Sequence, residues 1–176
     1  MPEKSDQLIY GLDSLPPEVR SCVLTIGNFD GVHLGHQRIL ATARSLADAA
    51  GIGVVVMTFE PPPDQVIRPN DVRQRLTPPD EKGRLLLDAG ADWVVFARSE
   101  RALFEMPPQA FLDEIIVGRF APRHMIEGSN FFFGKARGGT VETLRDAGAE
   151  MGFEVHLADS IELDMPDGPT HVSSTL

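Results

Sequence analysis

The chain has 176 residues, 42% hydrophobic and 24% charged, a composition typical of one globular domain with a sizeable core. Its net charge of −10 argues against nucleic-acid partners and against an anionic membrane surface, so any phosphate ligand needs a local positive site. The single cysteine, Cys22, excludes an internal disulfide, and with no signal peptide and no apolar run near the roughly 20 residues that span a bilayer, we expect a cytoplasmic protein.

The first part of the chain carries strand and helix patterns in turn. Residues 1–20 are polar and proline-bearing, and we interpret them as an N-terminal extension with one strand or turn. The apolar run 21–26 predicts a buried strand. Apolar residues at helical spacing over 35–50 predict a helix, and Gly51 follows as the usual helix stop. A second continuous apolar run, 54–59, is typical of a strand in a parallel sheet.

A loop is expected over 64–76, because the prolines that follow the second strand cannot continue a ladder of backbone hydrogen bonds. Arg68, Arg73 and Arg75 lie in this loop. It is either a solvated surface loop or a flap over a ligand at the carboxyl-terminal edge of the sheet, and the sequence favours neither.

The rest of the chain repeats the alternation. Thr77 is expected to cap a helix that stops at Gly90. The further elements are a strand at 93–97, a helix that begins at Pro107, a strand at 123–127, a helix from Thr140 to Gly152 and a strand at 153–157. Alternating strands and helices predict βαβ units, so we expect an α/β fold: one doubly wound parallel sheet of about five strands with helices on both faces.

The stretch 27–36 lies between the first predicted strand and its helix and reads Gly-Asn-Phe-Asp-Gly-Val-His-Leu-Gly-His. Ligands bind at such junctions in open α/β sheets, and the free N–H groups of a helix N-terminus favour phosphate. His33 and His36 are therefore candidate functional residues. The alternative for a single histidine at a helix start is a cap or a solvated side chain, but the whole string at this junction favours a functional site.

The second informative stretch, 128–140, contains three consecutive phenylalanines, 131–133, between glycines. Alternation places the first and third phenylalanine on one face and the second on the other. The stretch is either the end of a core strand or a stacking surface for a flat ring, with Lys135 and Arg137 as cations for a phosphate. Residues 138–140 open a helix and offer a second N-terminus suited to anions.

The string at 27–36 resembles the His-x-Gly-His signature of nucleotidyltransferases. Its full form resembles the FMN adenylyltransferase (FAD synthetase) domain of prokaryotic bifunctional riboflavin kinase/FAD synthetases. Three further stretches resemble motifs of that family in the same order: 58–61, 128–134 and 171–176. The chain departs from the family at three positions: Pro62 stands where many members have His, Asn130 where many have Asp, and His171 where some have Arg.

The resemblance implies a Rossmann-like nucleotidyltransferase domain over 21–176 that transfers AMP from ATP to FMN and releases pyrophosphate. The sequence lacks the Ile-Arg pair, the next helix and the riboflavin kinase domain of the family, so we expect a domain truncated at its C-terminus. The expected catalytic residues are His33 and His36, which donate hydrogen bonds as charge develops on the phosphates. The candidate ATP and phosphate ligands are Gly27, Asn28, Phe29, Asp30, Gly35, Ser173, Ser174 and Thr175. The candidate FMN ligands are Phe59, Asn130, Phe131, Phe133, Lys135 and Arg137.

Magnesium is expected to bridge the ATP oxygens and to stay largely hydrated, so that few protein ligands are needed. Asp30 could orient the ion or hold its loop, and we favour the structural role. The expected partners are FMN and ATP alone, and the oligomeric state stays unknown.

Two other functions remain open. One is a different His-x-Gly-His nucleotidyltransferase, against which the form of the 27–36 string argues. The other is a module that binds flavin or nucleotide without turnover. A dehydrogenase and a P-loop ATPase are disfavoured, because neither glycine-rich phosphate motif is present.

Overall fold

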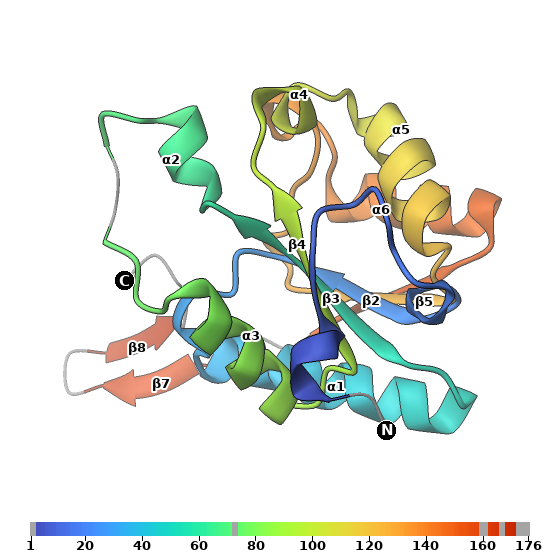
Figure 1. Ribbon diagram of the computed structural model, residues 1–176, viewed down its shortest axis with the longest axis horizontal. Coiled ribbons are helices and arrows are strands. Elements are labelled where there is room, and N and C mark those ends of the chain that lie inside the picture. Colours follow the sequence, from blue (N-terminus) through green and yellow to red (C-terminus); the bar gives the residue numbers. More distant parts are fainter. Residues whose placement is uncertain (1–2, 72–73, 159–161, 166–167, 172–176) are drawn as a thin grey trace.

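The computed structural model describes residues 3–71, 74–158, 162–165 and 168–171. Six strands form one parallel sheet through the middle of the molecule, in the order β1-β4-β3-β2-β5-β6 (Figure 1). They are β1 (Leu8–Tyr10), β2 (Val23–Ile26), β3 (Val54–Glu60), β4 (Trp93–Arg98), β5 (His124–Glu127) and β6 (Glu154–Leu157). A separate antiparallel pair consists of β7 (Glu162–Met165) and β8 (Gly168–His171).

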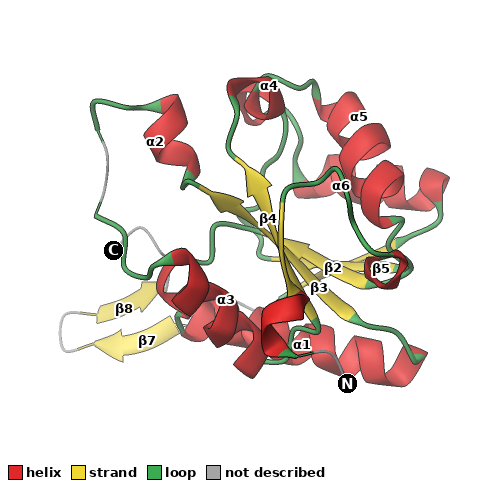
Figure 2. Cartoon of the chain, viewed as in Figure 1, coloured by secondary structure: helices red, strands yellow, loops and turns green. Residues whose placement is uncertain are grey.

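Helices cover both faces of the sheet (Figure 2). One face packs against α1 (Leu34–Ala50) and α3 (Pro79–Asp88), and the other packs against η4 (Phe111–Phe120) and α6 (Val141–Met151). The shorter helices are η1 (Lys4–Gln7), η2 (Pro17–Val19), η3 (Asp30–Val32), α2 (Pro63–Ile67), α4 (Arg101–Phe104), α5 (Pro108–Ala110) and η5 (Lys135–Arg137). The doubly wound α/β sheet is thus confirmed, with one strand more than the five expected.

The central strands are apolar because both of their faces are covered. All four residues of β2 are buried, and so are the first five of β3. Along β3 the side chains alternate: Val54 and Val56 belong to the core under α1 and α3, whereas Val55 and Met57 belong to the core under η4 and α6. None of the helices in the described residues is long and apolar enough to cross a membrane.

The additional strand comes from the segment that we interpreted as an extension. β1 pairs with β4 in the register Leu8↔Val94 and forms one edge of the sheet. Val19, which also precedes residue 21, is fully buried in the core. Residues upstream of 21 are therefore part of the folded unit.

Two expectations about helix starts and loops are corrected. Thr77 does not cap α3, because the helix begins at Pro79 with Pro78 as its N-cap, and the Thr77 hydroxyl bonds Asp30 instead. The loop at 64–76 is not a plain loop, since α2 occupies its beginning. The other helix signals hold: Gly51 ends α1 with φ +66°, and the Thr140 side chain caps α6.

The order of the strands creates a crevice between β2 and β5. From β2 the chain passes through α1 to β3 and through α3 to β4 on one side, and then returns through η4 to β5 on the other side of β2. At the carboxyl ends of these neighbouring strands the outgoing loops diverge, and this is where open α/β sheets bind their ligands. The stretches 27–36 and 128–140 follow β2 and β5 and so meet at this crevice.

Candidate active site

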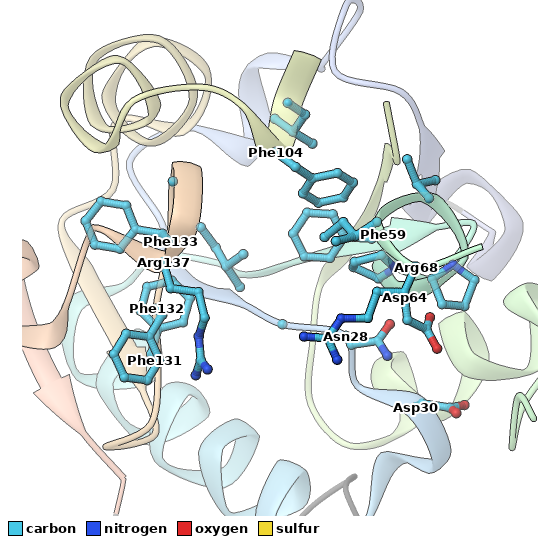
Figure 3. Close-up of a pocket in the computed structure, with 18 of the residues that line it drawn as sticks. Asn28, Asp30, Phe59, Asp64, Arg68, Phe104, Phe131, Phe132, Phe133 and Arg137 are labelled. Atoms are coloured by element: carbon cyan, nitrogen blue, oxygen red, sulfur yellow. The ribbon is translucent and has the colours of Figure 1, made fainter. Parts of the chain in front are cut away.

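A cleft of about 1160 Å³ lies at the carboxyl-terminal edge of the sheet. Its lining comes from the loop after β2, the end of β3 with α2, the region of α4, and the loop after β5. Figure 3 shows Phe131, Phe132, Phe133 and Arg137 on one side and Asp64 and Arg68 on the other, with Asn28 between them. The segments 64–68 and 131–137, far apart in the sequence, therefore form opposite sides of one cleft.

The loop after β2 is shaped by a buried aromatic ring. Phe29 has φ 52° and is only 2% exposed, and its ring packs edge to face with the His36 ring, with the centroids 4.9 Å apart. Its side chain therefore supports the turn from within the core and does not line the cleft, and its role as a phosphate ligand stays a prediction. Its neighbours Gly27, Asn28 and Asp30 do line the cleft.

His33 caps a helix with one ring nitrogen and leaves the other without a partner among the described residues. Its Nδ1 accepts hydrogen bonds from the backbone N–H groups of Gly35 (3.1 Å) and His36 (3.4 Å) at the start of α1. Because Nδ1 accepts, the proton of the neutral ring sits on Nε2. That Nε2 is buried and has no hydrogen-bond partner in the described part of the chain. The capping alternative and the functional one are thus compatible, since each uses a different ring nitrogen.

His36 stacks on His33 with ring centroids 3.5 Å apart. Burial, followed by the neighbouring His33, lowers the pKa of His36 to about 3, and burial also lowers the pKa of His33. Both rings are therefore neutral at pH 7. The His36 Nδ1 atom is buried without a partner among the described residues. Among the described residues that line the 1160 Å³ cleft, neither histidine is included. The pair lies beside the cleft, at the start of α1.

Asp30 holds the end of the 64–76 segment. Its carboxylate accepts hydrogen bonds from the backbone N–H groups of Leu76 and Thr77 at 3.0–3.1 Å and from the Thr77 hydroxyl at 3.1 Å. This arrangement favours the structural role over the metal role. Within the residues that the structure describes, no group of three His, Cys, Asp or Glu side chains gathers at the cleft.

The sequence analysis did not identify Lys82, although its side chain holds the Asn28 turn beside the cleft. This side chain of α3 is 3% exposed, and its Nζ donates to the carbonyl oxygen of Asn28 (3.0 Å) and to Thr58 Oγ1 (3.1 Å). Burial, the largest cause, lowers its pKa to about 8. A signal existed, because Lys82 lies four residues before the buried Leu86 and therefore on the core-facing side of the helix.

Glu127 is a second buried charged residue that we missed. It ends β5, and its Oε1 accepts a hydrogen bond from the backbone N–H of Ile26 at 2.7 Å. This contact ties the ends of β2 and β5 together where the two loops diverge. Complete burial raises the pKa of Glu127 well above its usual range.

The aromatic loop after β5 follows the expected alternation. Phe133 is 5% exposed and packs on Phe111 and Phe131, both at 5.8 Å between ring centroids. Phe132 points the other way, is 40% exposed, and carries the Arg137 guanidinium 4.1 Å from its ring centroid. All three phenylalanines line the cleft. The core interpretation holds for Phe133, and the stacking of a flat ring on this stretch stays a prediction.

The loop keeps this shape because its two arms are bonded to each other. The backbone N–H of Phe133 donates to the carbonyl of Gly139 (3.1 Å), and the N–H of Gly139 donates to the carbonyl of Phe133 (2.8 Å). A Cβ atom at Gly139 would lie 2.5 Å from the Phe133 ring. Asn130, Lys135 and Arg137 complete this side of the cleft.

The opposite side is formed by the end of β3 and the segment that follows it. Phe59 lies against Phe104 of α4 with ring centroids 5.9 Å apart. Arg75 donates to the Glu60 carboxylate at 2.7 Å, and Arg68 lines the cleft. Of the two alternatives for the 64–76 segment, this placement favours the flap.

Several expected residues have other placements. Pro62 lines the cleft. Gly35 lies in the first turn of α1 and is not among the described residues that line the cleft. The backbone of His171 lies in β8. Arg73, Ser173, Ser174 and Thr175 lie outside the described residues.

The fold and the site together define an α/β protein of the nucleotidyltransferase type, with the 27–36 turn after β2 and an aromatic loop after β5 at one cleft. More narrowly, the chain belongs to the FAD synthetase family, whose model matches residues 15–176.

Relatives named bifunctional riboflavin kinase/FMN adenylyltransferase share much of the sequence. The one from Pseudomonas fluorescens is 39% identical over 158 residues, which cover 90% of this chain and 50% of that protein. The one from Escherichia coli (strain K12) is 34% identical over 167 residues, 95% of this chain and 51% of that protein. The chain thus spans about half the length of the relatives it matches.

A solved structure with a similar fold is that of a macrolide-efflux protein from Streptococcus pneumoniae. It has a TM-score of 0.82 at 24% sequence identity and covers 96% of this chain and 54% of that chain. At this identity the likeness concerns the fold alone.

Proposed function

We propose that this chain is an FMN adenylyltransferase, which joins FMN to the AMP portion of ATP and releases pyrophosphate. The observation that carries the proposal is the meeting of the 27–36 turn and the 131–133 phenylalanines at one cleft, in a chain of the FAD synthetase family. Relatives that bear FMN adenylyltransferase in their names support it.

In the proposed reaction an oxygen of the FMN phosphate attacks the α-phosphorus of ATP. The new bond joins this oxygen to phosphorus, and the bond from the α-phosphorus to the oxygen of the β-phosphate breaks, so that pyrophosphate leaves with the electron pair. No protein nucleophile is needed, and the chain's task is to position the two anions and to stabilise the charge that develops.

His33 is suited to this task as a neutral donor. Its Nε2–H is already oriented, because the backbone of α1 occupies Nδ1. A preorganised donor of this kind is worth on the order of 3 kcal/mol in the transition state. The N-terminus of α1 adds the positive end of a 17-residue helix.

The flavin ring is proposed to lie between the aromatic loop and the β3 end of the cleft. Phe59 and Phe104 offer an apolar wall there, and the half-buried Phe131 offers a face of the opposite wall. Lys135 and Arg137 lie on the same side as Phe131 and suit the FMN phosphate.

Magnesium is proposed to enter as part of the substrate, bound to the ATP phosphates. The residues described around the cleft do not form a carboxylate cage, and the Asp30 oxygens are already bonded to backbone N–H groups. This fits an ion that keeps most of its water.

The test is FAD formation from FMN, ATP and Mg²⁺, followed by chromatography. We expect FAD with the unmodified chain, a loss of roughly a hundredfold or more in rate with His33→Ala, and no change with Ser45→Ala on the exposed face of the same helix. Quenching of FMN fluorescence without any FAD would identify a binding module. Absence of both FAD and flavin binding would overturn the proposal.

A further inference from the structure

Three potential metal ligands gather on strands β5 and β6, outside the lining of the cleft. They are His124, Glu154 and His156, and the reaction proposed above uses none of them. His124 and Glu154 stand directly opposite each other in the parallel pair, and His156 follows two residues later on the same strand. Since alternate residues of a strand share a face, all three side chains project from one side of the sheet.

The three donor atoms form a small triangle. His124 Nδ1 lies 3.2 Å from His156 Nε2, and these nitrogens lie 3.5 Å and 3.6 Å from Glu154 Oε2. A tetrahedral Zn²⁺ with bonds of about 2.0–2.1 Å holds its ligand atoms about 3.3–3.4 Å apart. The triangle therefore has the size of one face of a zinc coordination tetrahedron, without any movement of the strands.

The electrostatics of the cluster also suit a cation. Both imidazoles are partly buried beside the Glu154 carboxylate, and a histidine binds a metal through the lone pair of its neutral ring. The Glu154 side chain is 72% exposed and brings a negative charge to the open side. Two imidazole nitrogens and one carboxylate oxygen favour zinc over Mg²⁺ or Ca²⁺, which prefer oxygen ligands alone.

We propose that His124 Nδ1, Glu154 Oε2 and His156 Nε2 bind one Zn²⁺ ion, with water as the fourth ligand. The ion would join the edge strand β6 to β5, the strand from which the aromatic loop of the cleft departs. Its role is therefore to brace the sheet edge, and the proposed adenylyl transfer does not depend on it.

The experiment is a titration of the chelator-treated chain with ZnCl₂, followed by calorimetry, and with CoCl₂, followed by visible absorption. We expect one ion per chain and a cobalt spectrum of the tetrahedral type. His156→Ala and His124→Ala should each weaken binding by roughly tenfold or more, and Glu154→Gln should weaken it less. Glu150→Gln, an exposed carboxylate of α6, is the matched control and should leave binding unchanged.

The stacked pair His33 and His36 is the competing site for zinc in the described part of the chain. The proposal is wrong if His36→Ala abolishes zinc binding while His156→Ala retains it. It is also wrong if none of the three cluster variants alters the titration, since the cluster is then a hydrogen-bonded network only. Should a histidine variant fail to fold, the zinc titration of the exposed Glu154→Gln variant decides instead. The melting temperature of the unmodified chain, which should rise when ZnCl₂ is added, is the second measurement. Because the readout is metal binding, failure here and failure of FAD formation are separate results.

Discussion

Three titratable side chains around the first turn, the partly buried His36 and the buried Lys82 and Glu127, owe their pKa values mainly to desolvation. In each case burial is the largest cause of the pKa shift, and it favours the neutral form. At neutral pH this removes the charge of Glu127, whereas Lys82, with a pKa of about 8, stays mostly protonated. Each shift links protonation to stability in a way that can be measured.

Glu127→Gln should be more stable than the unmodified chain, and the gap should widen with pH. The unfolded carboxyl loses its proton from its ordinary pKa of 4.5, whereas the buried one keeps it, so the native state binds more protons and loses stability as pH rises. The gap grows by at most about 1.4 kcal/mol per pH unit. Urea denaturation at pH 5, 6, 7 and 8 measures it, and a gap that is constant with pH would contradict this account.

His36 should not titrate between pH 8 and 5 in the folded chain without substrates. With its folded pKa at about 3 and an ordinary value of 6.5, only the unfolded state takes up a proton in that window, so folding stability falls as pH decreases below 6.5. Proton NMR of the imidazole Cε1–H over this range measures the titration. The urea-unfolded chain is the control, and a folded midpoint near 6.5 would show that the ring is solvated.

Lys82→Met should destabilise the fold by about 1–3 kcal/mol, because the Asn28 carbonyl and the Thr58 hydroxyl lose their shared donor. Arg84→Met, on the exposed side of α3, is the control and should change stability by less than about 0.5 kcal/mol. Denaturation and FAD formation are measured together. If Lys82 positions the turn, the KM for ATP rises along with the loss of stability, whereas a merely structural lysine changes stability alone.

Among the elements, the hairpin-like loop 128–140 shows how backbone and aromatic side chains depend on each other. Gly139→Ala should weaken FMN binding, since the added Cβ atom would meet the Phe133 ring at 2.5 Å and the loop must shift. Gly128→Ala is the matched control, because a Cβ atom there has no neighbour within 4 Å. FMN fluorescence titration compares the two variants. Equal affinities would mean that the Phe133 ring shifts to make room and that the FMN site is unchanged.

The sequence predicts the elements better than it predicts the contacts among them. The helix over 35–50 and the strand over 54–59 could be predicted because periodicity and helix stops are local. β1 could be anticipated only as a strand or turn somewhere in residues 1–20, since three residues carry no period. The burial of Lys82 and Glu127 depends on what packs over them, and residue type alone argues for exposure.

The same holds for the candidate site. The meeting of the 27–36 and 128–140 stretches could be anticipated from the carboxyl-end rule for parallel sheets. Phe29 was assigned to the ligand because it stands within the motif, and the burial of its ring beside the cleft could not be predicted from that motif. The contribution of Phe104 was missed, because α4 lies outside every motif and meets Phe59 only in three dimensions.

For the molecule as a whole, the crossed order of the sheet places β5 beside β2 and leaves β1 and β6 at the edges. The edge strand β1 has only three residues and one neighbour, β4. Its amides should therefore exchange with D₂O earlier than those of β3, which is paired on both sides. Hydrogen exchange followed by mass spectrometry tests this, and equal protection of the two strands would show that the sheet opens only as one unit.

The same pairing has a consequence for synthesis on the ribosome. β1 is translated before β4, and α1, β3 and α3 must be made in between. Until β4 emerges, Leu8 and Ile9 have no strand with which to pair. In the nascent chain this apolar segment therefore stays unpaired until β4 has been translated. During that interval it is exposed for binding by a chaperone.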